Sequence, residues 1–396
     1  MILAAMDDYE AMIAFEEYEE LSIDSVAEFA RLYVIGDFIQ AKDVSDGNIN
    51  RVFRVFGDRS SVIVKQALPY LRVAGRAWPL TRHRIITENS AYNIHNSLVP
   101  RVMPAILNFD QEMSTIVMED LQGFLPWRES LLLNQDGSHV PRVVAQYCSE
   151  ILIRTSNLVL DESKHREIKE KFYYTELCLV TEELFFTAPY MENKSNRFDS
   201  ELQSLVEELQ SDEVLRASAS EMRTIFKTKD QALIHGDLHS GSVMVSEDQV
   251  RIIDLEFAFY GPFGFDLGVL FANLALSRLA HEALGNSEYA LTIDSYAKEI
   301  WVTFIANLKL LSSKYSFDVS EFLQSMEHDM HRFAGMEMIR RIIGLAHAKE
   351  IDLLPDSLRL KSQVNAIQNG EALLVGSSGF DFELFWKTAT REVNNE

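Results

Sequence analysis

The spacing of apolar residues along the chain changes near residue 122. Between residues 42 and 67, apolar and polar positions alternate, most regularly in 52–56 and 61–67, which is the period of a half-buried β-strand. A Gly57-Asp58 pair separates these two runs, so together they predict a β-hairpin. After residue 122, apolar residues recur at the period of amphipathic helices. The pattern predicts an α+β protein with a small β-rich N-terminal lobe and a larger, mainly helical C-terminal lobe.

Further segments fit this division. Residues 21–36 have apolar residues at helical spacing, with Ser22 or Asp24 as the N-cap. A loop with Trp78 then precedes a helix that carries Glu88, and the stretch after that helix, up to residue 121, predicts two more strands. Longer helical patterns follow, and they occupy residues 143–160, 198–210, 295–311 and 333–351.

Composition narrows the functional classes. The 396 residues are 47% apolar, which is enough for two domains with substantial cores. The chain has 60 acidic and 37 basic residues, and a net charge of −23 disfavours nucleic acid and anionic membrane as partners. Acidic residues appear by residue 7 and no apolar run reaches about 18 residues, so we expect a cytoplasmic protein without a signal peptide or membrane span. Cys148 and Cys178 lie outside any metal-ligand spacing, and both are expected to be reduced core thiols.

The candidate chemistry is concentrated in residues 233–268. Two short strand-like runs there each end in a loop that carries carboxylates: Asp237 follows the first run, and Asp254 and Glu256 follow the second. A third acid, Asp266, follows a Gly/Pro turn. In kinases one Asp orients and deprotonates the attacking hydroxyl, while other acids hold Mg²⁺ against the ATP phosphates. We therefore interpret Asp237 as the base and the Asp254/Glu256 pair as metal ligands, although a lone Asp after a strand is more often a turn or capping residue.

The hairpin predicts the matching nucleotide site. Lys65 lies in the middle of its second strand, where a kinase places the ammonium that binds the α- and β-phosphates. Glu88 is the candidate partner of this ammonium. The turn at 46–48 has the position of a loop that covers the phosphates. The alternatives are a solvent-facing lysine, a solvated glutamate and an ordinary β-turn.

Several segments together resemble the aminoglycoside-phosphotransferase-like kinases and, within that superfamily, the methylthioribose kinases of bacteria and plants. They include DGNINRVF, VIVKQALPY, the WPLT loop, TIVMEDL, LIHGDLHSGSV, IIDLEFAFYGPFGFDLG and IRRIIGLAH, and the resemblance runs from about residue 21 to about residue 351. It implies a bilobal protein-kinase-like fold, with an N-lobe at 21–121 and a C-lobe at 122–396, and the acidic lead at 1–20 lies outside it. It also implies ATP- and Mg²⁺-dependent phosphorylation of the anomeric hydroxyl of 5-methylthioribose in methionine salvage, usually by a homodimer.

The resemblance also assigns residues position by position. The residues that it implies for nucleotide binding, including the backbone of a hinge at 119–121, are Asn50, Lys65, Glu88, Glu119, Asp120, Leu121, Asp254, Leu255 and Glu256. Those that it implies for the sugar are Asp237, Arg340 and Arg341, with the Trp78 loop closing over the site. Ser242 stands where many members of the superfamily have a metal-binding Asn, so the second metal-ligand role passes to Glu256.

The twin arginines bear on the substrate independently of the resemblance. Arg340 and Arg341 lie in an otherwise apolar helix, where burial is costly unless each is paired or faces a site. Facing the site they would bind sugar hydroxyls, which favours an uncharged polyol over a cationic acceptor; the alternative is a surface ion pair with Glu337 or Glu350. Two other functions stay open, a kinase of another small alcohol or pentose and a nucleotide-binding pseudokinase. Intact Lys65, Asp237 and Asp254 weigh against the latter.

Overall fold

Two units of different composition make up the chain in the computed structural model, which describes residues 18–45, 49–72, 75–173, 175–376 and 380–392. Unit 1 comprises residues Met1–Gly123 and the short segment Ile253–Glu256. Unit 2 comprises Phe124–Ile252 and Phe257–Glu396. The candidate metal ligands Asp254 and Glu256 therefore belong to unit 1, although they follow the Asp237 loop of unit 2 in sequence.

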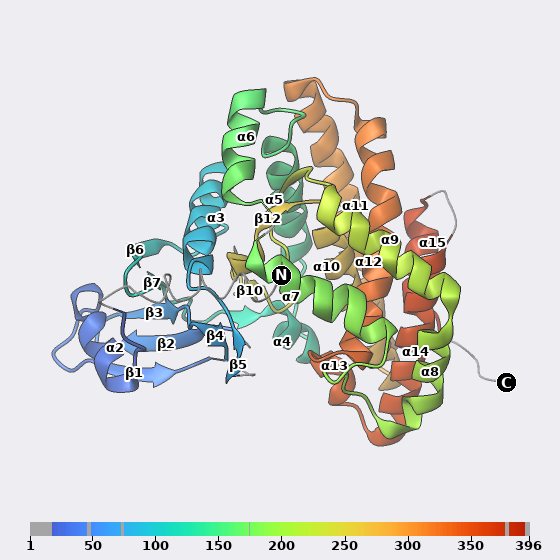
Figure 1. Ribbon diagram of the computed structural model, residues 1–396, viewed down its shortest axis with the longest axis horizontal. Coiled ribbons are helices and arrows are strands. Elements are labelled where there is room, and N and C mark those ends of the chain that lie inside the picture. The colour runs from blue at the N-terminus through green and yellow to red at the C-terminus, as the bar shows by residue number, and fades with distance from the viewer. Residues whose placement is uncertain (1–17, 46–48, 73–74, 174, 377–379, 393–396) are drawn as a thin grey trace. The chain divides into compact units, whose positions relative to one another are not determined.

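Unit 1 is built on a five-stranded antiparallel sheet with the strand order β1-β2-β3-β7-β6 (Figure 1). The predicted hairpin is confirmed as β2 and β3, in which Arg51 is paired with Gln66, and the two further strands are confirmed as β6 and β7. The elements of unit 1 are α2 (Ile23–Phe29), η1 (Arg31–Tyr33), β1 (Gln40–Asp43), β2 (Arg51–Phe56), β3 (Ser61–Gln66), β4 (Tyr70–Leu71), β5 (Gly75–Pro79), α3 (Arg84–Leu98), β6 (Ile106–Asp110) and β7 (Thr115–Glu119).

Helix α2 covers one face of this sheet. Ser22 is its N-cap, and a capping box with Ser25 satisfies the first free N–H groups. The helix ends at Phe29, earlier than the predicted residue 36, because a 3-10 turn follows. One core holds α2 against the strands, and its fully buried residues include Val26, Phe53, Val55, Val62, Val64 and Val117.

Two predictions for unit 1 need comment. Trp78 was expected in a loop, but the structure places it in β5, which pairs with β4. The loop prediction was wrong because the 75–79 stretch has a partner strand, and a single sequence does not reveal such a pairing. The predicted phosphate-covering turn at 46–48 lies outside the described residues.

Unit 2 is mainly helical, as predicted, and three short strand pairings support its loops (Figure 1). Strand β10 pairs with β8 and β11, and β9 pairs with β12. The elements are β8 (Leu125–Pro126), α4 (Trp127–Leu132), α5 (Val140–Arg154), α6 (Glu162–Lys171), α7 (Glu176–Thr181), η2 (Glu182–Thr187), η3 (Ala188–Tyr190), η4 (Ser200–Leu202), α8 (Gln203–Ser211), α9 (Glu213–Thr228), β9 (Ala232–Ile234), β10 (Val243–Val245), β11 (Val250–Ile252), η5 (Leu255–Phe257, which begins in unit 1), β12 (Phe259–Gly261), α10 (Phe265–Ala283), α11 (Ser287–Tyr315), α12 (Val319–Ile343), α13 (Lys349–Asp352), α14 (Asp356–Val375) and α15 (Phe382–Thr390).

Close helix packing sets the position of α12, which carries the twin arginines. A Cβ added at Gly268 of α10 would lie 2.5 Å from the Met330 carbonyl oxygen, and one at Gly335 of α12 would lie 2.4 Å from the Gly370 carbonyl oxygen. Only glycine allows such backbone approaches, so α12 is held tightly between α10 and α14. Helix α12 ends at Ile343, so the predicted helix 333–351 was too long, and a separate short helix, α13, carries Glu350.

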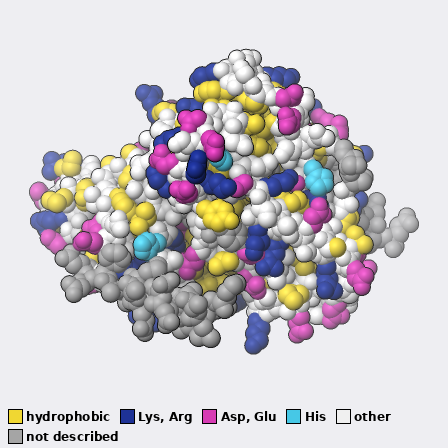
Figure 2. All heavy atoms as spheres, turned by 45° about the horizontal axis from the view of Figure 1, so that its top comes forward, with side chains coloured by type: hydrophobic (Ala, Val, Ile, Leu, Met, Phe, Trp, Pro, Cys, Tyr) yellow, Lys and Arg dark blue, Asp and Glu magenta, His cyan; other side chains and the backbone are white. Residues whose placement is uncertain are grey.

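Charged side chains of both signs lie on the face of the molecule that Figure 2 shows. Figure 2 shows acidic and basic side chains intermingled over the face turned to the viewer. Among the helices of the described ranges, none combines the length and apolarity needed to cross a bilayer.

Candidate active site

The ammonium of Lys65 is the centre of a buried charge cluster in unit 1. Its Nζ lies 2.8 Å from Glu88 Oε1, 2.9 Å from Asp254 Oδ1 and 3.7 Å from Glu256 Oε2. Lys65 and Glu88 are buried, whereas half of the Asp254 side chain is exposed. The structure therefore brings together four residues that the sequence singled out, and the readings of Lys65 as a solvent-facing side chain and of Glu88 as a solvated one are wrong.

The cluster keeps Lys65 charged. Burial alone would lower the pKa of Lys65, but Asp254, Glu256 and Glu88 outweigh it and hold that pKa well above its ordinary value. Burial raises the pKa of the Glu88 carboxyl to about 7, against the opposing effect of Lys65, with Glu256 and Asp254 adding to the rise. Lys65 thus offers a fixed positive charge to an anion such as a phosphate.

Asp254 is held in an unusual backbone conformation. Its φ of 63° lies in the left-handed region, which Asp tolerates better than most residues but at a cost in free energy. The Asp254 backbone N–H donates to the hydroxyl of Tyr92 on α3 at 2.9 Å, and Leu255 is fully buried behind it. Buried neighbours therefore fix the direction of the Asp254 carboxylate, and Leu255 anchors the segment through its side chain.

Asn50 joins the same cluster from the start of β2. Its Nδ2 donates to Glu256 Oε2, and its Oδ1 accepts from Arg84 Nη2 at 2.7 Å. Arg84 Nη1 also donates to the Leu68 carbonyl oxygen at 2.7 Å. Asn50 therefore orients Glu256 and is itself oriented by a buried arginine of α3.

The donors of this cluster suit a divalent cation bound together with nucleotide. Mg²⁺ in phosphotransfer sites takes one or two carboxylates, with phosphate oxygens and water as the other ligands. Asp254 and Glu256 supply two hard oxygen donors, and among the described residues no cluster of three or more His, Cys, Asp or Glu could hold a metal. The residues fit an ion that arrives with its nucleotide.

The predicted hinge at 119–121 begins with Glu119, the last residue of β7. Glu119 N–H donates to the Ala105 carbonyl oxygen at 2.8 Å, and the Asp120 carbonyl oxygen accepts from Gln122 N–H at 2.9 Å. The Asp120 carboxylate pairs with Arg54 at 3.0 Å. The Asp120 side chain thus serves unit 1 itself, so any adenine contact at 119–121 is left to the backbone, where it stays a prediction.

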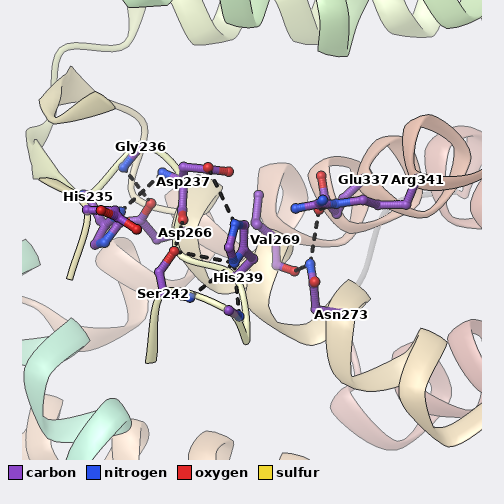
Figure 3. A network of polar contacts seen from close by, with 12 residues as sticks. His235, Gly236, Asp237, His239, Ser242, Asp266, Val269, Asn273, Glu337 and Arg341 are labelled. Atoms are coloured by element: carbon purple, nitrogen blue, oxygen red, sulfur yellow. Dashed lines mark hydrogen bonds and ion pairs between the residues drawn. The ribbon is translucent and has the colours of Figure 1, made fainter. Parts of the chain in front are cut away.

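In unit 2, a buried carboxylate shapes the loop that carries Asp237 (Figure 3). The Asp266 oxygens accept from the backbone N–H groups of His235 at 2.7 Å and of Gly236 at 2.9 Å. Gly236 has φ 81°, and a Cβ there would lie 2.2 Å from the Phe257 carbonyl oxygen, so this turn requires glycine. Burial raises the pKa of Asp266, while His235 and these hydrogen bonds oppose the rise. Asp266 therefore positions the loop through buried hydrogen bonds, whereas the carboxylate of Asp237 in the same loop is partly exposed.

His239 and Ser242 complete this loop. His239 Nδ1 accepts from the N–H groups of Gly241 at 2.9 Å and Ser242 at 3.1 Å, which places the ring proton on Nε2, 3.6 Å from Asp237 Oδ2. Burial holds the pKa of His239 well below its ordinary value, and Arg341, Arg128 and Arg340 add to this. Ser242 is buried, and its Oγ donates to the Asp237 carbonyl oxygen at 3.1 Å. The hydroxyl of Ser242 is thus used within the loop.

The twin arginines meet the loop from α12 and share one buried carboxylate. Glu337 Oε1 accepts from Arg341 Nε at 2.7 Å and from Asn273 Nδ2 at 3.0 Å (Figure 3). Glu337 Oε2 accepts from Arg340 Nε. Arg340 Nη2 lies 3.6 Å from Asp237 Oδ1. Arg340 therefore faces the candidate base, and both arginines pair with Glu337. Glu337 is fully buried, so the alternative of a surface ion pair is wrong in its location.

An aromatic ring also contacts the Arg340 guanidinium. Its guanidinium carbon lies 5.0 Å from the centre of the Phe185 ring, in cation–π range. Phe185 belongs to η2, a π-helical turn, and such turns are frequent at functional sites. The guanidinium is thus held by a ring and a carboxylate.

Sequence reasoning missed several residues that these contacts reveal. Tyr92 and Arg84 of α3 position the unit 1 cluster, and His239 and Asn273 position groups in unit 2. Two signals were available: the second His of the HGDLH motif, and the spacing of Glu337 three and four residues before the arginines, which puts all three on one helix face. The contacts of Tyr92 and Asn273 join residues far apart in sequence and left no such signal.

Comparison with known proteins places this geometry in a family. The sequence pattern described as "Phosphotransferase enzyme family" matches residues 40–298, well over half of the chain. The chain belongs to the phosphotransferase enzyme family. Two relatives named methylthioribose kinase, from a Geobacillus species and from Bacillus pumilus, are each 34% identical to it; the alignments cover 91% and 90% of this chain and 92% and 93% of theirs. The family resemblance expected from the motifs is confirmed.

This phosphotransferase also resembles solved structures at low identity. Ethanolamine kinase from Plasmodium vivax is 16% identical, with a TM-score of 0.44 over 89% of this chain and 81% of that one. The family match, the antiparallel N-terminal sheet and the large helical region after it confirm the predicted kinase-like α+β class.

Proposed function

We propose that this phosphotransferase transfers the γ-phosphoryl group of ATP to the anomeric hydroxyl of S-methyl-5-thioribose, giving the 1-phosphate of methionine salvage. The observation that carries the proposal is the group of charges around Asp237. Arg340 lies 3.6 Å from the Asp237 carboxylate, and Arg341 is joined to the same buried acid, Glu337. Two guanidinium groups beside the base disfavour a cationic acceptor such as an amine and suit a neutral polyol. The names of the relatives point to the same substrate.

The residues divide the chemistry as follows. Asp237 accepts the proton of the attacking hydroxyl, and the Arg340 guanidinium stabilises the negative charge that develops during transfer. Lys65 binds the nucleotide phosphates in unit 1, and Asp254 and Glu256 would hold Mg²⁺, which neutralises phosphate charge when it is bound. His239, uncharged and with its proton on Nε2, directs that proton towards Asp237 and keeps the carboxylate oriented.

The first experiment identifies the acceptor. ATP consumption is measured with methylthioribose, ribose, choline and an aminoglycoside, and turnover is expected with methylthioribose above all. Preference for ribose or for another alcohol would replace this substrate while leaving the kinase activity in place. No turnover with any acceptor, together with intact nucleotide binding, would favour the pseudokinase hypothesis.

The second experiment tests the arginines. Arg340→Lys and Arg341→Lys keep the charge but lose the planar fork that binds two oxygens at once. We expect the KM for methylthioribose to rise or kcat to fall by roughly tenfold or more for at least one variant, with little change in the KM for ATP. Two variants with wild-type constants would remove the arginines from sugar binding.

A further inference from the structure

A third arginine of unit 2 lies against the loop that carries Asp237. Arg128 is in α4, and its backbone N–H donates to the Ser240 carbonyl oxygen at 3.1 Å. Its Nη2 lies 2.7 Å from the position that a Cβ on Gly241 would occupy. Its Nε is buried and has no hydrogen-bond partner in the part of the chain that the structure describes. Arg128 is thus anchored beside the catalytic loop with unused donor capacity.

Glu350 provides unused acceptor capacity from the neighbouring helix. It lies in α13 with 3% of its surface exposed, and its Oε2 is buried without a hydrogen-bond partner among the described residues. The adjacent Lys349 pairs with Glu129 of α4, Nζ to Oε1, at 2.7 Å, which ties the two helices together. Burial raises the pKa of Glu350, while the charges of Arg128 and Arg341 oppose the rise. The Glu350 carboxyl is therefore within electrostatic reach of both arginines.

The two unused groups do not satisfy each other. The structure records no ion pair between the described side chains of Arg128 and Glu350, although the charge of Arg128 acts to lower the pKa of Glu350. A buried donor and a buried acceptor without partners both weaken a fold, so proteins seldom retain them without a further reason. A hydroxyl group donates one hydrogen bond and accepts others, so a single hydroxyl serves a carboxylate and a guanidinium together.

We propose that Arg128 and Glu350 form a hydroxyl-binding subsite for the acceptor sugar, next to the twin arginines. Glu350 accepts a hydrogen bond from one sugar hydroxyl, and Arg128 donates a hydrogen bond to it. The subsite lies beside the loop of the candidate base, because a Cβ on Gly241 would meet both Arg128 Nη2 at 2.7 Å and His239 Cε1 at 2.8 Å, and His239 is two residues from Asp237. This assignment rests on the proposed function to the extent that the acceptor is a polyol, and it adds two specificity-determining residues to that site.

The first test compares two glutamates on neighbouring helices. Glu350→Gln keeps the shape of the side chain but removes its charge, and it is expected to raise the KM for methylthioribose roughly tenfold or more, with the KM for ATP within about twofold of wild type. Glu129→Gln makes the same chemical change in the partly exposed partner of Lys349 and is expected to leave both constants within about twofold. If both variants changed the KM for methylthioribose equally, Glu350 would have only a structural role in the contact between α4 and α13.

The second test identifies the hydroxyl. In the wild type, either the 2-deoxy or the 3-deoxy analogue of methylthioribose is expected to lose roughly tenfold or more in kcat/KM, because it leaves Glu350 and Arg128 unpaired. In Glu350→Gln, and in Arg128→Lys as a second variant, the same analogue should lose less than about threefold relative to the parent sugar. Substitution of a purely structural residue would lower kcat/KM for both sugars by the same factor. If the ratio of kcat/KM between the parent sugar and the deoxy analogue is the same in the variants as in wild type, the proposal is overturned.

A failure of the proposed function would look different. If the wild type ignores methylthioribose and phosphorylates another polyol, the same comparison is made with deoxy analogues of that polyol. The subsite is refuted if the variants discriminate against the deoxy analogue as strongly as wild type does. If the accepted substrate carries no second hydroxyl, the subsite is refuted. Stability is measured in parallel: Glu350→Gln should unfold at the same denaturant concentration as wild type or higher, because Oε2 has no protein partner to lose. A clear loss of stability in Glu350→Gln, with acceptor constants unchanged, also refutes it.

Discussion

Glu337 should be the most sensitive position of unit 2, and the substitution Glu337→Gln tests this. The residue is fully buried, and its two oxygens accept from Arg340, Arg341 and Asn273. The glutamine keeps the shape and one acceptor oxygen, but its amide nitrogen turns a donor towards a guanidinium. Removing one partner of a buried ion pair costs about 3–5 kcal/mol, and the retained acceptor places this variant near 3 kcal/mol. That is a large part of the ~5–15 kcal/mol by which a typical protein is stable.

Glu337→Gln should also lower the rate of phosphoryl transfer. Arg340 depends on Glu337 for its direction towards Asp237, and a misplacement of about 1 Å at a reacting centre can cost about 100-fold in rate. We expect kcat/KM for the acceptor to fall by about that factor, while nucleotide binding in unit 1 is retained. Urea unfolding followed by tryptophan fluorescence measures the stability, since Trp127, Trp301 and Trp386 all lie in unit 2. Steady-state kinetics with each substrate varied in turn measures the rest.

Glu182→Gln is the matched control. Glu182 is also buried and also pairs with two cations, Arg223 and Lys227, but these cations are 45% and 42% exposed. Water therefore solvates them when the carboxylate is lost, and the cost should stay at about 1 kcal/mol with wild-type kinetics. If Glu337→Gln behaved like this control in both stability and acceptor kinetics, the buried acid would not be what holds the twin arginines.

The pH dependence of stability is an independent test of the charge on Glu337. Burial alone would raise the pKa of Glu337, but Arg340 and Arg341 outweigh it and hold the pKa below its ordinary value of 4.5. A lowered folded-state pKa contributes stability that is present above the unfolded value and is lost as the pH falls through the folded value. The stability difference between wild type and Glu337→Gln should therefore be constant between neutral pH and about pH 5, and should shrink below about pH 4.5. A difference that grew on acidification would contradict this charge assignment.

Two further substitutions test the division of roles. Asp237→Asn should retain the fold and nucleotide binding but lose roughly 100-fold or more in phosphoryl transfer, because an amide cannot accept the hydroxyl proton; activity within about threefold of wild type would remove Asp237 from that role. Asp254→Ala should weaken Mg²⁺-dependent nucleotide binding, measured by calorimetry, more than Glu256→Ala, because the Asp254 side chain is half exposed, whereas Glu256 is 12% exposed and accepts a hydrogen bond from Asn50. An unchanged Mg²⁺ requirement in both variants would show that the metal binds elsewhere.

Local pattern determined the elements of this protein, because alternation and helical periodicity are short-range properties of a sequence. The β2–β3 hairpin, helix α3 and the strand–loop–strand frame of Asp237 and Asp254 could all be predicted in this way. The motifs also indicated the chemistry, since a base and metal-binding acids at kinase spacing lie within one short stretch. Errors fell where an element depends on a partner, as for Trp78 in β5, or where apolar periodicity was followed past a stop signal, as at Ile343, which Gly344 follows as the C-cap.

Only the tertiary structure decided which charges meet and which are buried. Lys65 and Asp254 are 189 residues apart in sequence, and Asn273 is 64 residues from Glu337, so no periodicity reports their contacts. Burial also changes the role of a residue. In the sequence, Glu337 resembles an ordinary acid on a solvent-exposed helix face. In the structure it is fully buried and is the shared ion-pair partner of two arginines. A charge in water costs little to leave alone, whereas a charge in a packed interior needs a partner or a ligand, and only the fold shows which of the two it has.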